Sequence, residues 1–580
     1  MSENFPELSE NALTVLEKRY LLKGRSGEVI ETPEDMFRRV ARNVASVDYF
    51  HHDRDAEKEQ AEFHHMMRSL EFLPNSPTIM NAGTPMQQLA ACFVIPVGDS
   101  IEQIFDAVKF AAVIHQTGGG TGFSFSKLRP AGDIVASTGG TASGPISFMK
   151  VFDVATDAVK QGGRRRGANM GVLRVDHPDI REFVRVKADL KTLSNFNISV
   201  GVTDEFMDRA AEGRQFELIN PRNGGVAGTV HAGSLLDDIC SLAWSTGDPG
   251  MIFLDEIGRT NPTPGLGDIE ATNPCGEVPL LPFEACNLGS VNLDRMLAEG
   301  KGGYELDREK LKDTVDAGIR FLDNVIDVSK YPLKQIDNIV KGNRKVGLGV
   351  MGFADLLAKL GVRYGSRESE EMAGEIIGTM RDQAERTTKR IGEERGDFPN
   401  IGASDFRSPR RNATVLSIAP TGTISMIANC SSGIEPFFAL YYDKHVLEGQ
   451  TLHEMNRSFF EQAAERGLDE NRAVGLMSKE GSIQRSGAIP QELRDIFVTA
   501  HDIEPMRQVR MQSIFQGQVD NAVSKTINLP ESSTVEDVRT IFQYARDLRC
   551  KGITVYREGT KPGQVYTGRG VECATCGQLV

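Results

Sequence analysis

The chain has 580 residues, of which 40% are hydrophobic and 25% are charged, as is ordinary for a globular protein. Its net charge of −14, from 80 acidic and 66 basic residues, argues against nucleic acid as a partner, because the one basic cluster is short. The N-terminus lacks the features of a signal peptide, and no run of about eighteen apolar residues predicts a membrane span. Eight cysteines are too few for a disulfide scaffold, so we expect a cytoplasmic protein.

Helical and strand patterns alternate along the chain, which predicts an α/β fold. Thr32 as a cap and Pro33 in the first turn predict an early helix with an apolar stripe. Residues 196–202 alternate between apolar and smaller or polar side chains, which predicts a half-buried strand. Near the end, residues 533–536 form a capping box that starts a helix, and residues 553–556 predict the next strand.

A basic loop at residues 160–167 combines three glycines with four positive charges. On charge alone, the simplest interpretation is a solvated surface loop.

Residues 273–277, with the sequence Asn-Pro-Cys-Gly-Glu, are the most informative segment. If this backbone is extended, Asn273, Cys275 and Glu277 share one face, because strand side chains alternate with period two. Two more cysteines are candidates: Cys286, eleven residues on, and Cys92, within an apolar run. A lone cysteine is more often a buried structural residue. A carboxylate beside a thiol needs a chemical reason, which favours a catalytic site.

Residues 414–419 predict a buried strand, and Pro-Thr-Gly-Thr-Ile follows at once as residues 420–424. Small hydroxylated residues and a glycine at the start of a helix can bind phosphate through backbone N–H groups and the helix dipole. An ordinary strand-to-helix turn is the alternative.

Together these segments resemble the catalytic subunit of ribonucleotide reductases, from about Leu13 to the C-terminus. Residues 75–78, 117–123 and 161–169 add to the resemblance through their order and spacing. The resemblance implies a ten-stranded α/β barrel with Cys275 on a loop threaded through its centre. We expect an N-terminal helical region over residues 1–70, the barrel with its effector loops over 71–558, and a flexible redox tail over 559–580.

The family's reaction reduces ribonucleotides to 2′-deoxyribonucleotides for DNA synthesis. By resemblance, Cys275 carries the thiyl radical, Glu277 is the general base and Asn273 orients the sugar, while Cys92 and Cys286 form the reducing dithiol. The implied substrate-binding residues are Ser76, Ala91, Gly120, Pro420, Thr421, Gly422, Thr423 and Ile424. We expect a ribonucleoside diphosphate as substrate, with a triphosphate as the alternative.

The resemblance also implies regulation by a deoxynucleoside triphosphate effector at the interface of a homodimer. The basic loop then becomes a specificity loop, and residues 136–141 complete the site. The implied effector-binding residues are Asp99, Ser100, Ile101, Arg129, Lys160, Gln161 and Arg165.

The radical source separates the classes of the family. Diiron-dependent large subunits carry an adjacent tyrosine pair on the last barrel strand, whereas this chain has only Tyr556 there. That segment resembles the adenosylcobalamin-dependent class, so the cobalt of that cofactor is the only metal expected. The alternatives are a diiron-partnered large subunit and a non-catalytic nucleotide-binding regulator. Intact Asn273, Cys275 and Glu277 argue against the regulator.

The C-terminal tail ends in a Cys-x-x-Cys pair, Cys573 and Cys576. Such a pair is half of a zinc ribbon or a redox shuttle. A zinc site needs four ligands, and no second pair lies nearby, which favours the shuttle. The shuttle would pass electrons from thioredoxin, or a similar reductant, to Cys92 and Cys286.

Overall fold

A ten-stranded sheet organises the chain, in the order β1-β13-β2-β3-β6-β7-β10-β20-β19 with β16 paired to β13. The computed structural model describes residues 8–51, 55–135, 139–160, 167–446, 450–469, 472–475, 477 and 482–560. The strands are β1 Phe72–Pro74, β2 Cys92–Val94, β3 Gly120–Ser124, β6 Asn169–Arg174, β7 Phe196–Val202, β10 Gly250–Phe253, β13 Ala285–Asn292, β16 Val346–Met351, β19 Thr526–Leu529 and β20 Gly552–Arg557.

The sheet closes into a barrel from two halves. In one half, β2, β3, β6, β7 and β10 run parallel. The other half contains the parallel pairs β13/β16 and β19/β20, and antiparallel pairs β2/β13 and β10/β20 join the halves. Two isolated bridges, Leu348–Leu416 and Ile418–Val523, connect β16 to the segment before β19 and complete the ring. The predicted α/β barrel is therefore confirmed.

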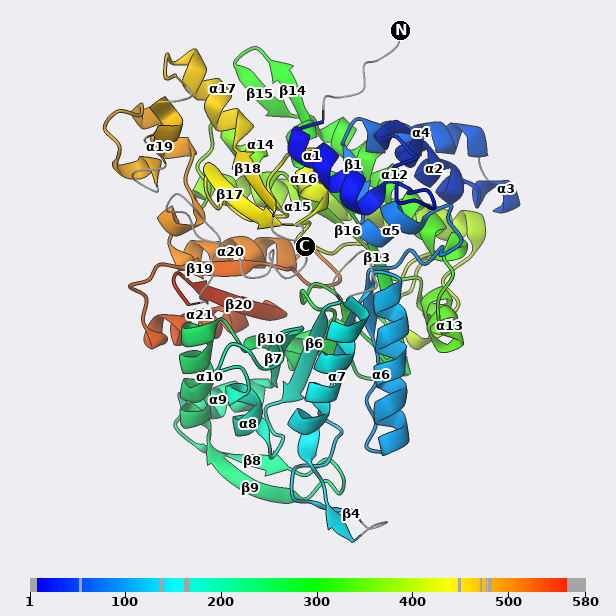
Figure 1. Cartoon of the computed structure of the whole chain (residues 1–580), viewed down its shortest axis with the longest axis vertical. Helices are drawn as coiled ribbons and strands as arrows, with labels where there is room; N and C mark the ends of the chain where they lie inside the picture. Colours follow the sequence, from blue (N-terminus) through cyan, green and yellow to red (C-terminus); the bar gives the residue numbers. More distant parts are fainter. Residues whose placement is uncertain are drawn as a thin grey trace.

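Helices cover the outside of the barrel (Figure 1). Two of them, α6 and α7, lie side by side, and the N-terminal helices α2 and α4 pack beside α12. The helices are α1 Glu10–Val15, α2 Pro33–Ala45, α3 Asp48–His51, α4 Ala56–Arg68, α5 Ser76–Asn81, α6 Ile101–Gln116, α7 Gly144–Lys160, α8 Ile180–Arg185, α9 Asp204–Ala211, α10 Ala232–Thr246, α11 Leu254–Arg259, α12 Arg308–Val328, α13 Lys334–Asn343, α14 Phe353–Lys359, α15 Arg367–Arg395, α16 Ile424–Ala428, α17 Arg457–Glu465, α19 Gln491–Ile496, α20 Pro505–Gln516 and α21 Val535–Asp547. No helix within the described ranges is long and apolar enough to cross a membrane.

In the described part of the chain, five short antiparallel strand pairs lie outside the ten-stranded sheet. They pair β4 Ile134–Val135 with β5 Gly140–Thr141, β8 Gln215–Ile219 with β9 Val226–His231, β11 Ala271–Thr272 with β12 Pro279–Leu280, β14 Leu297–Gly300 with β15 Gly303–Leu306, and β17 Tyr441–Val446 with β18 Gln450–Met455.

Local sequence signals place most of the predicted elements correctly. Thr32 caps α2, as its sequence predicts, and the structure adds a full capping box with Asp35. The capping box of α21 is shifted by one residue from the prediction, because Thr534 and Asp537 form it. Strand β7 is buried on both faces apart from Asn197, so the half-buried prediction is wrong; the barrel interior is filled. Residues 414–419 are buried but pair only through single bridges.

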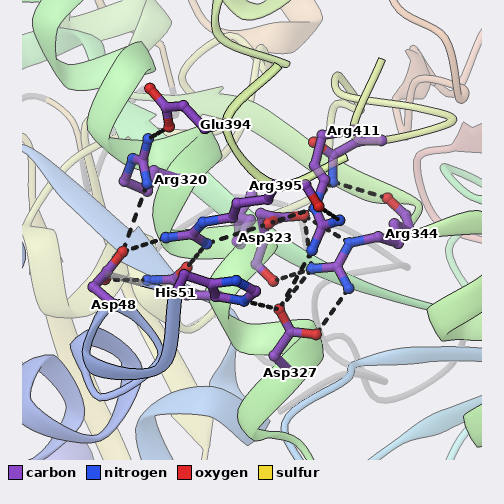
Figure 2. A network of polar contacts seen from close by, with 12 residues as sticks. Asp48, His51, Arg320, Asp323, Asp327, Arg344, Glu394, Arg395 and Arg411 are labelled. Carbon is purple, nitrogen blue, oxygen red and sulfur yellow. Dashed lines mark hydrogen bonds and ion pairs between the residues drawn. The ribbon is translucent and has the colours of Figure 1, made fainter. Parts of the chain in front are cut away.

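A buried ionic network connects the N-terminal helices to the barrel (Figure 2). Asp48 of α3 contacts both Arg320 of α12 and Arg395 at the end of α15. Asp323, fully buried one turn after Arg320, lies 2.9 Å from Arg344 and 3.3 Å from Arg411. Burial raises the pKa of the Asp323 carboxyl, but the attraction of Arg344, Arg411 and Arg395 outweighs burial and holds this pKa at about 2.

Candidate functional site

The segment Asn273–Glu277 lies at the tip of the hairpin formed by β11 and β12, which we call the central hairpin (residues 271–280). Its backbone is a tight turn and not an extended strand, so that part of the prediction is wrong. The N–H of Gly276 donates to the carbonyl of Asn273 over 3.1 Å, and Gly276 has φ 81°. This left-handed conformation favours glycine, which lets the turn form.

Two glycines of β3 allow the central hairpin to run close against the barrel wall. A Cβ on Gly122 would lie 1.7 Å from the carbonyl oxygen of Thr272. A Cβ on Gly120 would lie 2.9 Å from the ring of Pro274. From β7 of the barrel wall, Asn197 donates its side-chain N–H to the carbonyl of Pro274 over 2.8 Å. The tip is therefore held from two strands.

Contacts with neighbouring side chains and backbone groups hold Asn273 and Glu277 in place at the tip. Asn273 accepts from the N–H of Val278 over 3.0 Å and donates to the sulfur of Cys92 over 3.2 Å. The backbone carbonyl of Glu277 accepts from the Ser417 hydroxyl over 2.9 Å. The side-chain carboxylate of Glu277 lies 4.0 Å from the Cys92 sulfur. Both Asn273 and Glu277 are 2% exposed, so their orientation is set by these partners.

The three predicted site cysteines meet at this tip. Cys92 of β2 and Cys286 of β13 are directly opposite each other in an antiparallel pair. Opposite Cα atoms in such a pair are about 4.5–5.5 Å apart, which matches disulfide geometry. Burial raises the pKa of the Cys286 thiol well above its usual range, and Lys345 offsets this only in part. Cys286 is therefore a neutral thiol at cellular pH, whereas Cys275 is the only partly exposed member of the three.

A pocket of about 680 Å³, partly open to solvent, extends from the tip. It contains every substrate-binding residue predicted from the sequence, together with Cys92, Cys275, Asn273 and Glu277. Its lining is Asn75, Ser76, Ala91, Cys92, Gly120, Asn273, Pro274, Cys275, Glu277, Leu288, Gly289, Ser290, Ala419, Pro420, Thr421, Gly422, Thr423 and Ile424. Cys286 is fully buried behind this surface.

The loop before α16 forms one part of the pocket lining and has unusual backbone. Thr421 has φ 53°, a left-handed conformation that β-branched residues rarely adopt, and such outliers cluster at functional sites. Its hydroxyl accepts from the N–H of Gly433 over 2.8 Å. Beyond α16, the N–H of Ser431 donates to the Asp355 carboxylate over 2.6 Å. Burial and the nearby charge of Asp294 raise the pKa of Asp355 to about 6.

The predicted effector residues are only partly within the described chain. Asp99 binds Arg129 through an ion pair of 2.8 Å and accepts from its backbone N–H over 3.1 Å. Ser100 caps α6, and Ile101, the first residue of that helix, is 61% exposed. Lys160 ends α7. Outside the described residues lie Gln161, Arg165, residues 136–138 and the tail cysteines Cys573 and Cys576.

Six pocket residues were not predicted individually: Asn75, Pro274, Leu288, Gly289, Ser290 and Ala419. The period of a strand could have found two of them, because Cys286, Leu288 and Ser290 are at alternate positions of β13. Asn75 precedes the predicted Ser76 directly.

Family comparisons agree with this geometry over most of the chain. Residues 90–410 and 406–556 match the family described as "Ribonucleotide reductase, barrel domain", and residues 6–87 match "Ribonucleotide reductase, all-alpha domain". The chain belongs to the ribonucleotide reductase family. Its barrel and its N-terminal helices thus correspond to the two domain types of that family.

Individual members of the family are also similar to this chain. The chain is 47% identical to the "Vitamin B12-dependent ribonucleoside-diphosphate reductase" of Thermoplasma acidophilum, over 97% of this chain and 80% of that protein. A protein of the same name from Mycobacterium tuberculosis is also 47% identical, over 97% of this chain and 81% of its own length. Among solved structures, a class Id ribonucleotide reductase alpha subunit from Actinobacillus ureae has a TM-score of 0.80 at 23% identity, covering 96% of this chain and 99% of that one. That likeness concerns the fold.

Proposed function

We propose that this chain is an oxidoreductase that reduces ribonucleoside diphosphates to 2′-deoxyribonucleotides, with adenosylcobalamin as the radical source. The observation that carries this proposal is the hairpin tip, where Cys275, Asn273 and Glu277 face a pocket shared with Cys92. Relatives at 47% identity named for vitamin B12 and for diphosphate reduction support the cofactor and the substrate. The products, 2′-deoxyribonucleotides, are the precursors of DNA.

In the proposed reaction, Cys275 as a thiyl radical takes the hydrogen atom from C3′ of the ribose. Glu277 accepts the proton of the 3′-hydroxyl, and the 2′-hydroxyl leaves as water with a proton from the dithiol. Cys92 and Cys286 together give two electrons and two hydrogens and end as a disulfide. Cys275 finally returns its hydrogen to C3′. One C–OH and two thiols thus become one C–H, one water and one disulfide.

The accessibility of the three sulfurs fits the cofactor. Cys275 is partly exposed in the pocket, whereas Cys92 and Cys286 are buried, so an external radical source reaches Cys275 first. When bound, adenosylcobalamin supplies the carbon-centred radical that oxidises this thiol. The burial of Asn273 and Glu277 limits the water that reaches these two side chains, which reduces side reactions of a radical beside them.

The diphosphate is proposed to bind where residues 420–424 and Ser76 line the pocket. Backbone N–H groups and hydroxyls of this loop offer donors to phosphate oxygens. Ala91 and Gly120 keep the pocket wide, since neither has a large side chain.

A deoxynucleoside triphosphate effector is proposed to bind near Asp99, Ser100, Ile101 and Arg129, with Lys160, Gln161 and Arg165 from the specificity loop. A homodimer formed through α6 and α7 would complete this site. Exposed apolar side chains on these helices support the dimer: Phe105 is 50% exposed and Val154 70% exposed.

We also propose that Cys573 and Cys576 re-reduce the disulfide of Cys92 and Cys286, and that thioredoxin or a similar reductant then restores the tail. The burial of Cys286 supports this route, because a protein reductant cannot reach it directly. We propose that the reaction takes place in the cytoplasm, where thiols are normally kept reduced.

A diiron-partnered large subunit is not favoured. Relatives named "Ribonucleoside-diphosphate reductase subunit alpha" are 27% identical, well below those named for vitamin B12. A non-catalytic regulator would have no need for a fixed thiol and carboxylate at one tip.

Reduction of CDP by the purified chain tests the proposal, with a small dithiol as reductant and with or without adenosylcobalamin. We expect turnover only with the cofactor, both in air and under anaerobic conditions. Turnover without cobalamin that depends on an added diiron protein would overturn the cofactor assignment. Binding of CDP without any turnover under either condition would favour the regulator.

A further inference from the structure

Outside the proposed catalytic residues, two buried polar atoms in the pocket have no hydrogen-bond partner among the described residues. They are the side-chain nitrogen Nδ2 of Asn75 and the hydroxyl Oγ of Ser290. Asn75 is 8% exposed, Ser290 is fully buried, and both line the pocket. Buried polar groups are normally paired, so two such atoms in one pocket indicate a missing ligand.

Asn75 can offer only a donor to that ligand. Its side-chain oxygen already accepts from the N–H of Thr78 and from the Thr78 hydroxyl, each over 3.0 Å, and so caps α5. The amide nitrogen carries two hydrogens and no acceptor. The ligand atom that it meets is therefore an acceptor.

Ser290 lies away from the thiols along the same strand. It shares a strand face with Cys286 and Leu288 but is four residues beyond Cys286, which is about 13 Å along β13. The sugar must lie at the Cys275 end, because the chemistry takes place there. A substrate group that meets Ser290 would therefore lie beyond the sugar.

Asn75 and Ser290 are neighbours across two strands. Leu73 of β1 pairs with Ser290, and the N–H of Asn75 donates to the carbonyl of Leu288 over 2.8 Å, which extends that ladder by one residue. The two residues are thus diagonal neighbours, about 7–8 Å apart at Cα. Two donors at this spacing can each bind an oxygen of the same phosphoryl group.

We propose that Asn75 and Ser290 are specificity residues that donate hydrogen bonds to the substrate's diphosphate. They act together with Ser76 and residues 420–424, which line the same pocket. A phosphoryl group has acceptors only, as the Asn75 donor requires. The inference rests on the proposed function, because it assumes that the ligand is a ribonucleoside diphosphate.

The variants Asn75→Asp and Ser290→Ala test this pair. Asn75→Asp keeps the oxygen that caps α5 but replaces the donor with a negative oxygen. We expect it to raise the Kd of CDP, by calorimetry, and the KM of CDP reduction at least about tenfold, as for loss of a hydrogen bond to a charged group. Ser290→Ala should raise both about threefold to tenfold. We expect kcat and the KM for adenosylcobalamin to change less than about twofold.

Matched controls are available outside the pocket. Asn456 caps α17 through its side-chain oxygen, as Asn75 caps α5, but it lies outside the pocket. Asn456→Asp therefore makes the same chemical change away from the pocket. Ser199 is a buried serine of β7, so Ser199→Ala repeats the loss of a strand hydroxyl. Both controls should bind CDP like the unmodified protein.

The outcomes separate this proposal from the proposed function. Unchanged CDP binding in folded Asn75→Asp and Ser290→Ala proteins, with normal turnover of the unmodified protein, overturns only the diphosphate assignment. A raised KM for adenosylcobalamin with unchanged CDP binding also overturns it, since the pair would then face the cofactor. If the unmodified protein neither binds nor reduces CDP, both proposals fail. Should Asn75→Asp not fold by circular dichroism, Ser290→Ala alone decides.

Discussion

Cys275 differs from its two neighbours in burial, and this difference separates their proposed roles. A residue that receives a radical must be reached from the pocket, whereas a dithiol that is consumed once per turnover benefits from protection. Cys92 and Cys286 are buried and opposite each other, and Cys275 is partly exposed at the turn.

Replacing Cys275 by serine is expected to abolish reduction and to leave CDP binding nearly unchanged. The two side chains are almost the same size, but a hydroxyl does not form the radical that the reaction requires. Turnover and calorimetry with CDP measure the two effects. In a parallel variant, Glu277→Gln, we expect turnover to fall about 10²–10⁴-fold, the usual contribution of a general base. Normal turnover by Cys275→Ser protein would end the thiyl mechanism.

The raised pKa of Asp355 predicts a pH-dependent effect on stability. Its folded-state pKa of about 6 lies above the ordinary value of 3.8 for an aspartate, so its contribution to stability is complete below about pH 4 and is lost as the pH rises through about 6. Asp355→Asn keeps an acceptor for Ser431 and removes the buried charge. We expect the variant to be more stable at pH 8, by at most about 3 kcal/mol, and similar at pH 4. Urea unfolding at both values measures this; equal stability at pH 8 contradicts it.

At the residue scale, the sequence predicts which side chains lie close together better than it predicts the backbone conformation that brings them together. Asn273, Cys275 and Glu277 are close in sequence, so any compact conformation brings them together. The turn at Gly276 could not be predicted, because its left-handed backbone follows from packing of the hairpin in the barrel. The role of Ser290 depends on the ladder between β1 and β13, whose partners are 217 residues apart for the pair Leu73 and Ser290.

Among the elements, β3 and the central hairpin depend on each other most closely. The hairpin backbone crosses β3 where Gly122 has no side chain, so strand and hairpin approach at backbone distance. Close backbone approach is a frequent reason for glycine within a strand.

Gly122→Ala is therefore expected to displace the hairpin tip and to reduce turnover by at least about 100-fold, as misplacement of about 1 Å does in active sites. The added Cβ would lie 1.7 Å from the Thr272 carbonyl oxygen, and neither backbone can move freely. The control is Gly374→Ala in α15, where a Cβ meets nothing within 4 Å. That change should leave turnover unaltered and slightly stabilise the helix. Activity of Gly122→Ala equal to the control would show that the tip tolerates the shift.

Helices with capping signals could be predicted closely, as α2 and α21 show. Residues 414–419 could not be assigned from sequence to their irregular state. Their apolar pattern is that of a buried strand, but they pair through one bridge on each side, at Leu416 and Ile418. Pairing of that kind depends on partners far away in the chain.

For the whole molecule, the ionic network joins segments that are hundreds of residues apart. Four arginines face four carboxylates in it: Arg320, Arg344, Arg395 and Arg411 with Asp48, Asp323, Asp327 and Glu394 (Figure 2). No local sequence pattern predicts this arrangement, because each partner resembles an ordinary helix-surface charge until the fold buries it.

Arg395→Met should destabilise the protein by about 3–5 kcal/mol, since it leaves Asp48 and Asp323 buried with less counter-charge. The surface pair Arg367–Glu371 provides the control, because its side chains are 89% and 64% exposed. Arg367→Met should cost less than about 1 kcal/mol. The midpoints of urea unfolding of the two variants measure the difference. Similar midpoints would mean that the network contributes no more than a surface pair.

The tail proposal predicts a split between reductants. Protein with both Cys573→Ser and Cys576→Ser should lose thioredoxin-driven turnover but keep activity with a small dithiol, which can enter the pocket. The two rates are measured side by side. Undiminished thioredoxin-driven turnover, or stoichiometric zinc in the purified protein, would contradict the shuttle.

The contacts of Asp48 also bear on where this polypeptide can be cut. A fragment that begins at residue 71 would leave Arg320 and Arg395 without the carboxylate of α3, and would remove the Tyr20 hydroxyl, which lies 2.7 Å from the pocket residue Ser76. We expect such a fragment to be insoluble when expressed alone, and the helices alone to be unfolded. Co-expression of the two pieces should restore a complex. The N-terminal helices therefore belong to the same folding unit as the barrel, and a truncated version of this protein should keep both domain types together.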